Sequence, residues 1–199
     1  MNKIEEISRI AAEWWANAVC HPKFDNGDPS STGGMTMILA TMCTKPVSEF
    51  SKKLFIESLI KAIVQKLEGE NDEREITLSV DYGPCRILSE AAVGSSIKRN
   101  NFPWKTHMRI SNHHIGVRHG YGAPMEYLYI DQTYCEQRIE GEKRAIVSAQ
   151  DVNNFSYYDN EERKLESMKS RELDARNQLE FYENKKSELE AQEQTNSVQ

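Results

Sequence analysis

The chain has 199 residues, a formal net charge of -6, 38% hydrophobic residues and 28% charged residues. This length suits one domain with a buried core plus appended segments, and the composition is that of a soluble globular protein with a very polar portion. The sequence lacks the run of about 18 apolar residues that a membrane-spanning helix needs, and its N-terminus lacks the apolar stretch of a signal peptide. We therefore expect a cytoplasmic protein without a membrane segment, whose four cysteines are reduced thiols.

The first third of the chain predicts helices. Apolar residues recur at three- and four-residue steps over 4–19 and predict an amphipathic helix. The turn-forming residues 21–34 predict a loop, and the apolar residues 35–42 predict a short helix. Ser48 can cap a longer helix that extends to Leu67 and carries a wide apolar face. The members of that face are Phe50, Leu54, Phe55, Leu59, Ile60, Ile63 and Leu67.

The middle of the chain predicts strands. Residues 76–82 alternate between apolar and polar side chains, as in a half-buried strand, and a Gly-Pro pair then opens a short helix. Residues 104–121 predict a β-hairpin with Asn112 and His113 at its two-residue turn. Directly opposed residues share a face of the sheet, so this register gathers apolar side chains on one face. The predicted pairs are Ile110 with Ile115, Met108 with Val117, Thr106 with His119, and Trp104 with Tyr121.

The C-terminal part is charged and free of proline, and it predicts a long helix. Apolar residues fall on the a and d positions of heptads, interrupted by Glu172 and Lys186, which is typical of an imperfect coiled-coil seam. Such a helix can be a single extended arm, or it can pair in a homodimer or with a partner. The fold class is α+β, with helices packed on a small antiparallel sheet of about three strands. The predicted organisation is an α+β domain (1–130), a connecting segment (131–158), the charged helix (159–193) and a disordered tail (194–199).

The segment 98–123 reverses the charge of this acidic chain. It contains several lysines and arginines, four of the five histidines and no acid. In the predicted hairpin the second face carries Lys105, His107, Arg109, His114 and Arg118, and Gly116 and Gly120 leave this face open. A phosphate backbone can lie against such a face, or its cations can pair with acids from elsewhere in the chain. The candidate nucleic-acid or anion-binding residues are Lys98, Arg99, Lys105, His107, Arg109 and Arg118.

The histidines suggest two further kinds of site. A metal-independent nuclease needs two groups that exchange protons across a phosphate, and His107 and His114 are the candidates for that role. Zinc needs about four converging ligands, whereas these histidines diverge in the predicted hairpin. Asp25 and Asp28 fit an ordinary turn and lack the spacing of a calcium loop. The simpler interpretation has the histidines exposed or at the edge of the core, with no catalytic residue, metal or cofactor.

Five short motifs are Trp14-Trp15, Asp25-Asn26-Gly27-Asp28, Gly33-Gly34-Met35, Phe102-Pro103-Trp104-Lys105-Thr106 and Gly120-Tyr121-Gly122-Ala123-Pro124. Together they resemble a group of small proteins carried on phages and plasmids of Gram-positive bacteria. That group includes type II-A anti-CRISPR inhibitors of Cas9. The resemblance covers residues 4–125, so the long charged helix looks like an addition. None of the motifs is catalytic.

The resemblance implies a protein that binds Cas9 or the Cas9–guide RNA complex and blocks the loading or cleavage of DNA. Cas9 has strongly basic nucleic-acid channels, where an acidic helix can compete as an electrostatic mimic. The partner-binding residues of that route are Glu161, Glu162, Glu166, Glu172 and Asp174. The alternative is a nucleic-acid-binding protein, or a ribonuclease, that uses the cationic face of the hairpin.

Overall fold

The computed structural model describes residues 2–21, 46–68, 75–120, 122–153 and 161–196, with the side chains of 149–168 left undescribed. It divides the chain into two compact units, Met1–Tyr129 and Ile130–Gln199. The helix expected at 35–42 and the turn at Asp25–Asp28 lie outside the described residues. The N-terminal unit is α+β, as the sequence predicts.

Two long helices form the helical layer of the N-terminal unit. Helix α1 (Lys3–Cys20) begins at Asn2, whose side chain forms a capping box with Glu5. Helix α3 (Glu49–Leu67) begins at Ser48, and the Ser48 hydroxyl accepts the backbone N–H of Ser51 at 3.1 Å, which confirms the predicted cap. The predicted apolar face of α3 is wrong at Phe50, which is 72% exposed because it precedes the part of the helix that packs on the core.

The sheet has four antiparallel strands in the order β1-β2-β3-β4, one more than about three. The predicted hairpin register is confirmed: Thr106 pairs with His119, Met108 with Val117, and Ile110 with Ile115, while Tyr121 lies outside the described residues. Strand β1 ends at Val80 rather than at Tyr82, which is 87% exposed, because the chain turns back there in a bridge between Val80 and Pro84. The strands are β1 (Ile76–Val80), β2 (Thr106–Ile110), β3 (His114–His119) and β4 (Glu126–Ile130).

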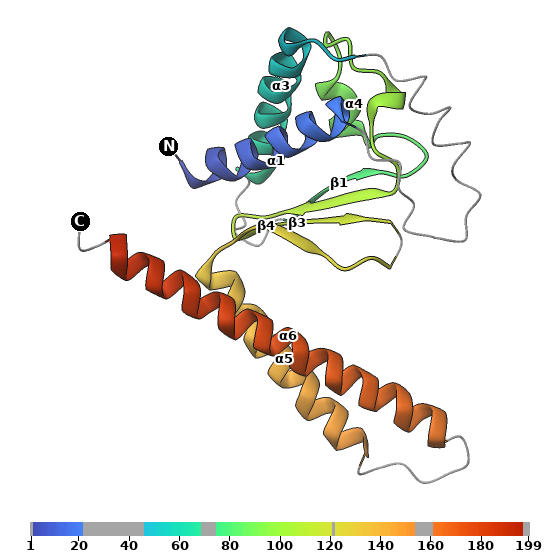
Figure 1. The fold of residues 1–199 in the computed structure, drawn as a ribbon, viewed down its shortest axis with the longest axis vertical. Helices are drawn as coiled ribbons and strands as arrows, with labels where there is room; N and C mark the ends of the chain where they lie inside the picture. Colours follow the sequence, from blue (N-terminus) through green and yellow to red (C-terminus); the bar gives the residue numbers. More distant parts are fainter. Residues whose placement is uncertain (1, 22–45, 69–74, 121, 154–160, 197–199) are drawn as a thin grey trace. The chain divides into compact units, whose positions relative to one another are not determined.

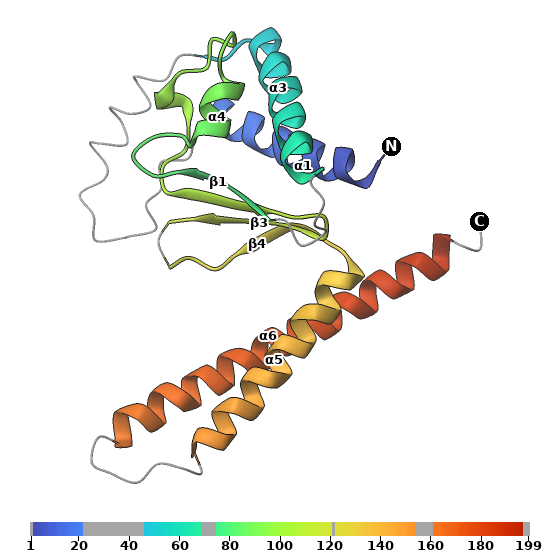
Figure 2. The same cartoon turned by 180° about the vertical axis from the view of Figure 1, so that it is seen from behind.

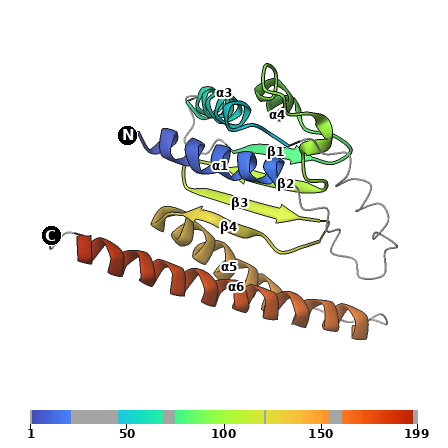
Figure 3. The ribbon, with the colours of Figure 1, turned by 45° about the horizontal axis from the view of Figure 1, so that its top comes forward.

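The core lies between the sheet and the helices on one of its faces (Figure 3). Trp15, Phe55 and Phe102 are fully buried there, with ring centroids 6.4 Å apart for Trp15 and Phe102 and 6.0 Å for Phe55 and Phe102. The short helix α4 (Arg86–Ala91) adds Leu88 to the same core, and the 3₁₀ turn Arg99–Asn101 leads into Phe102. Apolar burial on this one face fixes which residues of β2 and β3 point outward.

The C-terminal unit is a hairpin of two antiparallel helices that lie side by side, α5 (Gln132–Asn153) and α6 (Glu161–Asn196) (Figures 1 and 2). The expected connecting segment at 131–158 is therefore largely helical. The expected disordered tail is wrong at 194–196, because α6 continues to Asn196. Among the described residues of both units, no helix is long and apolar enough to cross a membrane.

The predicted heptad seam of α6 faces α5 in the same chain. Along α6, partly or fully buried residues recur at the a and d positions 172, 175, 179, 182, 186 and 189. Tyr182 is fully buried, and the Arg138 guanidinium of α5 lies 5.2 Å from its ring centroid. Lys186 bonds Glu136 at 3.0 Å, and this contact lowers the pKa of the Glu136 carboxyl. The two charged seam positions thus have polar partners within the hairpin.

Candidate anion-binding face of the sheet

The two faces of the sheet differ in what covers them. Helices α1, α3 and α4 pack on the inner face (Figure 3). The alternate residues point to the opposite face, which we call the outer face, and no described helix of the N-terminal unit lies on it. The outer face carries His107 and Arg109 on β2, His114, Gly116 and Arg118 on β3, and Tyr127 on β4.

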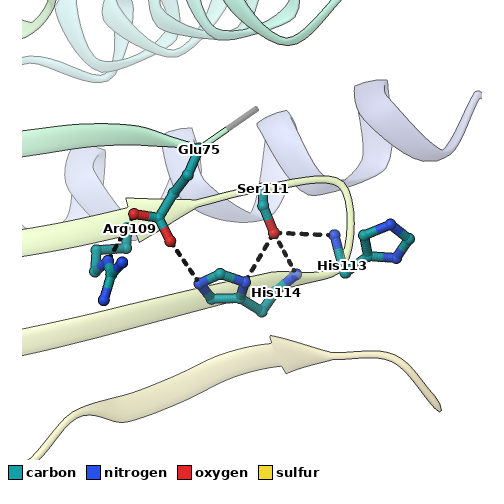
Figure 4. Close-up of polar contacts among 5 residues, drawn as sticks. All are labelled: Glu75, Arg109, Ser111, His113 and His114. Atoms are coloured by element: carbon teal, nitrogen blue, oxygen red, sulfur yellow. Dashed lines mark hydrogen bonds and ion pairs between the residues drawn. The ribbon is translucent and has the colours of Figure 1, made fainter. Parts of the chain in front are cut away.

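At the turn end of the outer face, a carboxylate and a hydroxyl hold His114 between them (Figure 4). One Glu75 oxygen accepts from Arg109 Nε at 2.7 Å, and the other lies 3.4 Å from His114 Nε2. Ser111 Oγ lies 2.7 Å from His114 Nδ1 and accepts the backbone N–H groups of His113 and His114, both at 3.2 Å. The network ties β1, β2 and β3 to the turn of the hairpin.

Serine hydrolases also place a carboxylate, an imidazole and a hydroxyl in this order. Here, however, the hydrogen bonds of the three groups indicate a structural role at the turn. Two amide N–H groups occupy the lone pairs of the Ser111 oxygen, so its hydroxyl proton is donated to His114 Nδ1. This assignment puts the imidazole proton on Nε2, toward Glu75. Ser111 is 7% exposed and His114 is 6% exposed, which leaves no room for a substrate. These residues therefore stabilise the turn.

Replacing Ser111 by alanine should lower the free energy of unfolding by about 2 kcal/mol, because the backbone N–H groups of His113 and His114 and an imidazole nitrogen lose their partner. Urea unfolding followed by circular dichroism measures this change. The exposed Ser96 gives the matched control, and Ser96→Ala should change stability by less than about 0.5 kcal/mol. Equal stability of the two variants would show that the Ser111 network contributes little.

At the other end of the outer face, His107 and Arg118 are directly opposed across β2 and β3. His107 Nε2 and Arg118 Nε are both closed off from solvent without a hydrogen-bond partner in the described chain. Buried polar atoms of this kind are uncommon and usually mark an ion, a water or a functional role. We call Lys105, His107 and Arg118 the cationic end.

Lys105 adds strain to the cationic end. Its φ of 52° lies in the left-handed region, which costs a non-glycine residue about 1 kcal/mol or more. The Lys105 carbonyl accepts the N–H of Gly120 at 2.8 Å, and this bond closes the open end of the hairpin. The bend positions the start of β2 beside the end of β3. A residue other than glycine at such a position is typical of a functional constraint.

The expectation that the glycines leave the outer face open is wrong at Gly116. A Cβ atom at this position would lie 2.8 Å from Met125 Cγ and 3.4 Å from Tyr127 Cε1. The side chains of Met125 and Tyr127 thus fill the space above Gly116. Gly116 therefore serves close packing, and it lies between His114 and Arg118 on the outer face of β3.

The six candidate anion-binding residues do not form one site. Arg109 is paired with Glu75, as the alternative interpretation of the charge run predicts. Lys98 and Arg99 precede the hairpin and are exposed, and Arg99 donates to the backbone carbonyl of Tyr82, with Nε at 3.1 Å. The structure therefore opposes His107 and Arg118, pairs the neighbouring Arg109 with Glu75, and leaves Lys98 and Arg99 outside the hairpin.

The acid–base pair proposed from the sequence is not formed. His107 is opposite Arg118, and Arg118 is four residues from His114 along β3. At 3.3 Å per residue this spacing puts the two histidines roughly 13 Å apart along the sheet, too far to flank one phosphate. Among the described residues, no group of three or more His, Cys, Asp or Glu is placed to hold a metal ion.

The acidic residues expected to bind a partner all belong to α6. Glu172 faces α5 and bonds Arg176 at 2.8 Å, so its charge is partly neutralised. Asp174 is exposed. Glu161, Glu162 and Glu166 lie in the first turns of α6, where side chains are not described. The exposed acids continue beyond the expected set, at Glu180, Glu183, Glu188, Glu190 and Glu193.

No protein-family model matches the chain, and a search of curated proteins finds no match. The residues themselves therefore carry the functional argument. Sequence reasoning missed Glu75 and Tyr127, which decide the character of the outer face. The run Tyr127-Leu128-Tyr129-Ile130, rich in residues that favour strands, is a signal that could have revealed β4.

Proposed function

We propose that this protein is a binding protein without catalytic activity, and that its outer face binds the phosphate backbone of a nucleic acid. The observation that carries the proposal is the cationic end: His107 Nε2 and Arg118 Nε are opposed side-chain nitrogens without a hydrogen-bond partner among the described residues, and the strained Lys105 lies just before β2. A phosphate oxygen accepts hydrogen bonds and carries negative charge. It would therefore provide both a hydrogen-bond partner for the nitrogens and a counterion for the cations. The Arg118 side chain would have to rotate to present its Nε to the ligand.

One feature favours a nucleic acid over a small anion. The half-buried Tyr127 lies on the same face as the cations, where an unpaired base can stack on it. The chain as a whole has a net charge of -6, which repels a polyanion, so a nucleic acid must be held by this local group. Binding should therefore depend on few residues.

The resemblance to anti-CRISPR proteins suggests which nucleic acid is bound. In this proposal the protein associates with the Cas9–guide RNA complex, its outer face contacts the guide RNA, and DNA loading or cleavage is blocked. The exposed carboxylates of α6 support a rival route, in which the helix occupies a basic channel of Cas9 as a mimic of nucleic acid. Both routes predict a stoichiometric complex.

The test is to incubate the protein with Cas9 and guide RNA, separate the mixture on a sizing column, and analyse the RNA on a denaturing gel. Coelution with intact guide RNA is the expected result. Loss of coelution in Arg118→Glu would assign contact to the outer face, and loss in Asp174→Lys with Glu180→Lys would assign it to α6. Shortened RNA would contradict the proposal of a binding protein, and absence of a complex would contradict the choice of Cas9.

A further inference from the structure

A second site, independent of the outer face, is a cavity of about 400 Å³ on the helical side of the N-terminal unit. It lies between the last turns of α1 and the edge strand β4. Its size is in the range of small-ligand sites, and it combines an apolar lining with a few polar groups, as such sites do. The lining residues that matter below are Trp14, Asn17, His21, His119, Glu126 and Leu128.

The aromatic part of the lining is held in place. The Trp14 and His119 rings lie 5.5 Å apart between centroids, and Trp15 packs against Trp14 edge to face at 5.2 Å. His119 Nδ1 lies 3.2 Å from the Thr106 hydroxyl, which fixes the orientation of the imidazole. Ordered aromatic rings at the wall of a cavity can receive an organic cation against their π-faces.

The charge of the lining also favours a cation in the cavity. Glu126 contributes a carboxylate, and no described lining residue is a lysine or an arginine. Asn17 and His21 belong to the carboxyl end of α1, where backbone carbonyls carry partial negative charge, and the last turn of α1 has no basic residue. A cation in the cavity would meet a carboxylate, a helix carboxyl end and two aromatic rings.

From this combination we infer that the cavity binds an organic ammonium group. The ammonium can belong to a small amine or to a lysine side chain of a partner protein, since both offer a positive charge on an apolar stem. The Glu126 carboxylate would pair with the charge, and Trp14 and Leu128 would contact the stem. This inference does not depend on nucleic-acid binding.

The full chain is titrated with choline chloride and, separately, with a short lysine-containing peptide, each against sodium chloride at equal ionic strength. The Trp14 indole N–H signal, assigned with Trp14→Phe, reports occupancy by NMR. We expect a saturable shift with a dissociation constant in the millimolar range or below for at least one probe. The probe that saturates first identifies the source of the ammonium.

Glu126→Gln should weaken the binding about tenfold, because the charge-assisted contact is lost. Glu126 is exposed, so the variant should fold normally, which circular dichroism verifies. Glu13→Gln removes an equally exposed acid from α1 outside the cavity and should leave the affinity unchanged. The inference is overturned if neither probe shifts the indole signal beyond the salt reference, or if the two glutamine variants bind alike.

Discussion

Replacing Arg118 by glutamate should weaken the binding of single-stranded RNA by about a hundredfold, because a charged donor is lost and a charge that repels phosphate takes its place. Arg118 contributes the guanidinium of the cationic end and is directly opposed to His107. Fluorescence anisotropy with labelled RNA, repeated at several salt concentrations, measures the effect. The dependence of affinity on salt should become shallower by about 0.7 per lost phosphate contact.

Arg86→Glu is the matched control for this prediction. Arg86 lies on α4, is 89% exposed at its side chain and pairs with Glu90, so the variant carries the same change of net charge away from the outer face. Its affinity for RNA should fall only slightly, through the general field of the protein. Equal losses in both variants would show that net charge governs binding, and would contradict a site at the cationic end.

Glu75→Gln makes the outer face more positive, whereas Arg118→Glu makes it more negative. It removes one negative charge beside Arg109, so the outer face becomes more attractive to a phosphate. Affinity for RNA should rise severalfold, while stability should fall by no more than about 1 kcal/mol, as for other partly exposed ion pairs. A weaker affinity in this variant would indicate that the contact of Glu75 with His114, which helps to hold the turn, matters more to RNA binding than the negative charge of Glu75.

The largest effect on stability is expected for Trp15→Ala, which should lower the free energy of unfolding by about 3–5 kcal/mol. Trp15 is fully buried and contacts both Trp14 and Phe102, so alanine leaves a large cavity in the core. A loss of this size approaches the total stability of many small domains. Urea unfolding followed by far-ultraviolet circular dichroism provides the measurement.

Two further variants separate packing from polarity at this position. Trp15 Nε1 is buried and has no hydrogen-bond partner in the described chain, so Trp15→Phe loses volume but no hydrogen bond, and it should cost much less than alanine. Trp104 is 50% exposed, and Trp104→Ala should have a small effect. A Trp15→Ala variant as stable as Trp104→Ala would contradict the position of the core between α1 and the sheet.

The hairpin and the cap at Ser48 could be predicted because local rules determine them. The alternation of apolar residues around Asn112 and His113 permits only one register that buries Met108 and Val117 together, and the structure has that register. The heptad positions of α6 were also predictable, since burial on α6 follows them from Glu172 to Leu189. In each of these cases the apolar pattern fits only one register or one buried face.

Local patterns could not predict helix α5, the ion-pair partner of Arg109 or the packing over Gly116. The seam of α5 is partly polar, with Arg138 and Glu142 bonded to each other at 2.6 Å, so its apolar periodicity is weak. The pairing of Arg109 depends on Glu75, 34 residues away in the sequence. Met125 fills the space over Gly116 only because β4 joins the sheet beside β3. These features follow from tertiary contacts.

The most direct test of nucleic-acid binding by the outer face is an NMR titration of the isotope-labelled full chain with a short single-stranded RNA. We predict that the backbone signals of His107 and Arg118 and the side-chain Nε–H signal of Arg118 shift first and most, with smaller shifts at Tyr127. Shifts confined to α6, or no shifts at RNA concentrations that bind other single-strand-binding proteins, would contradict the account.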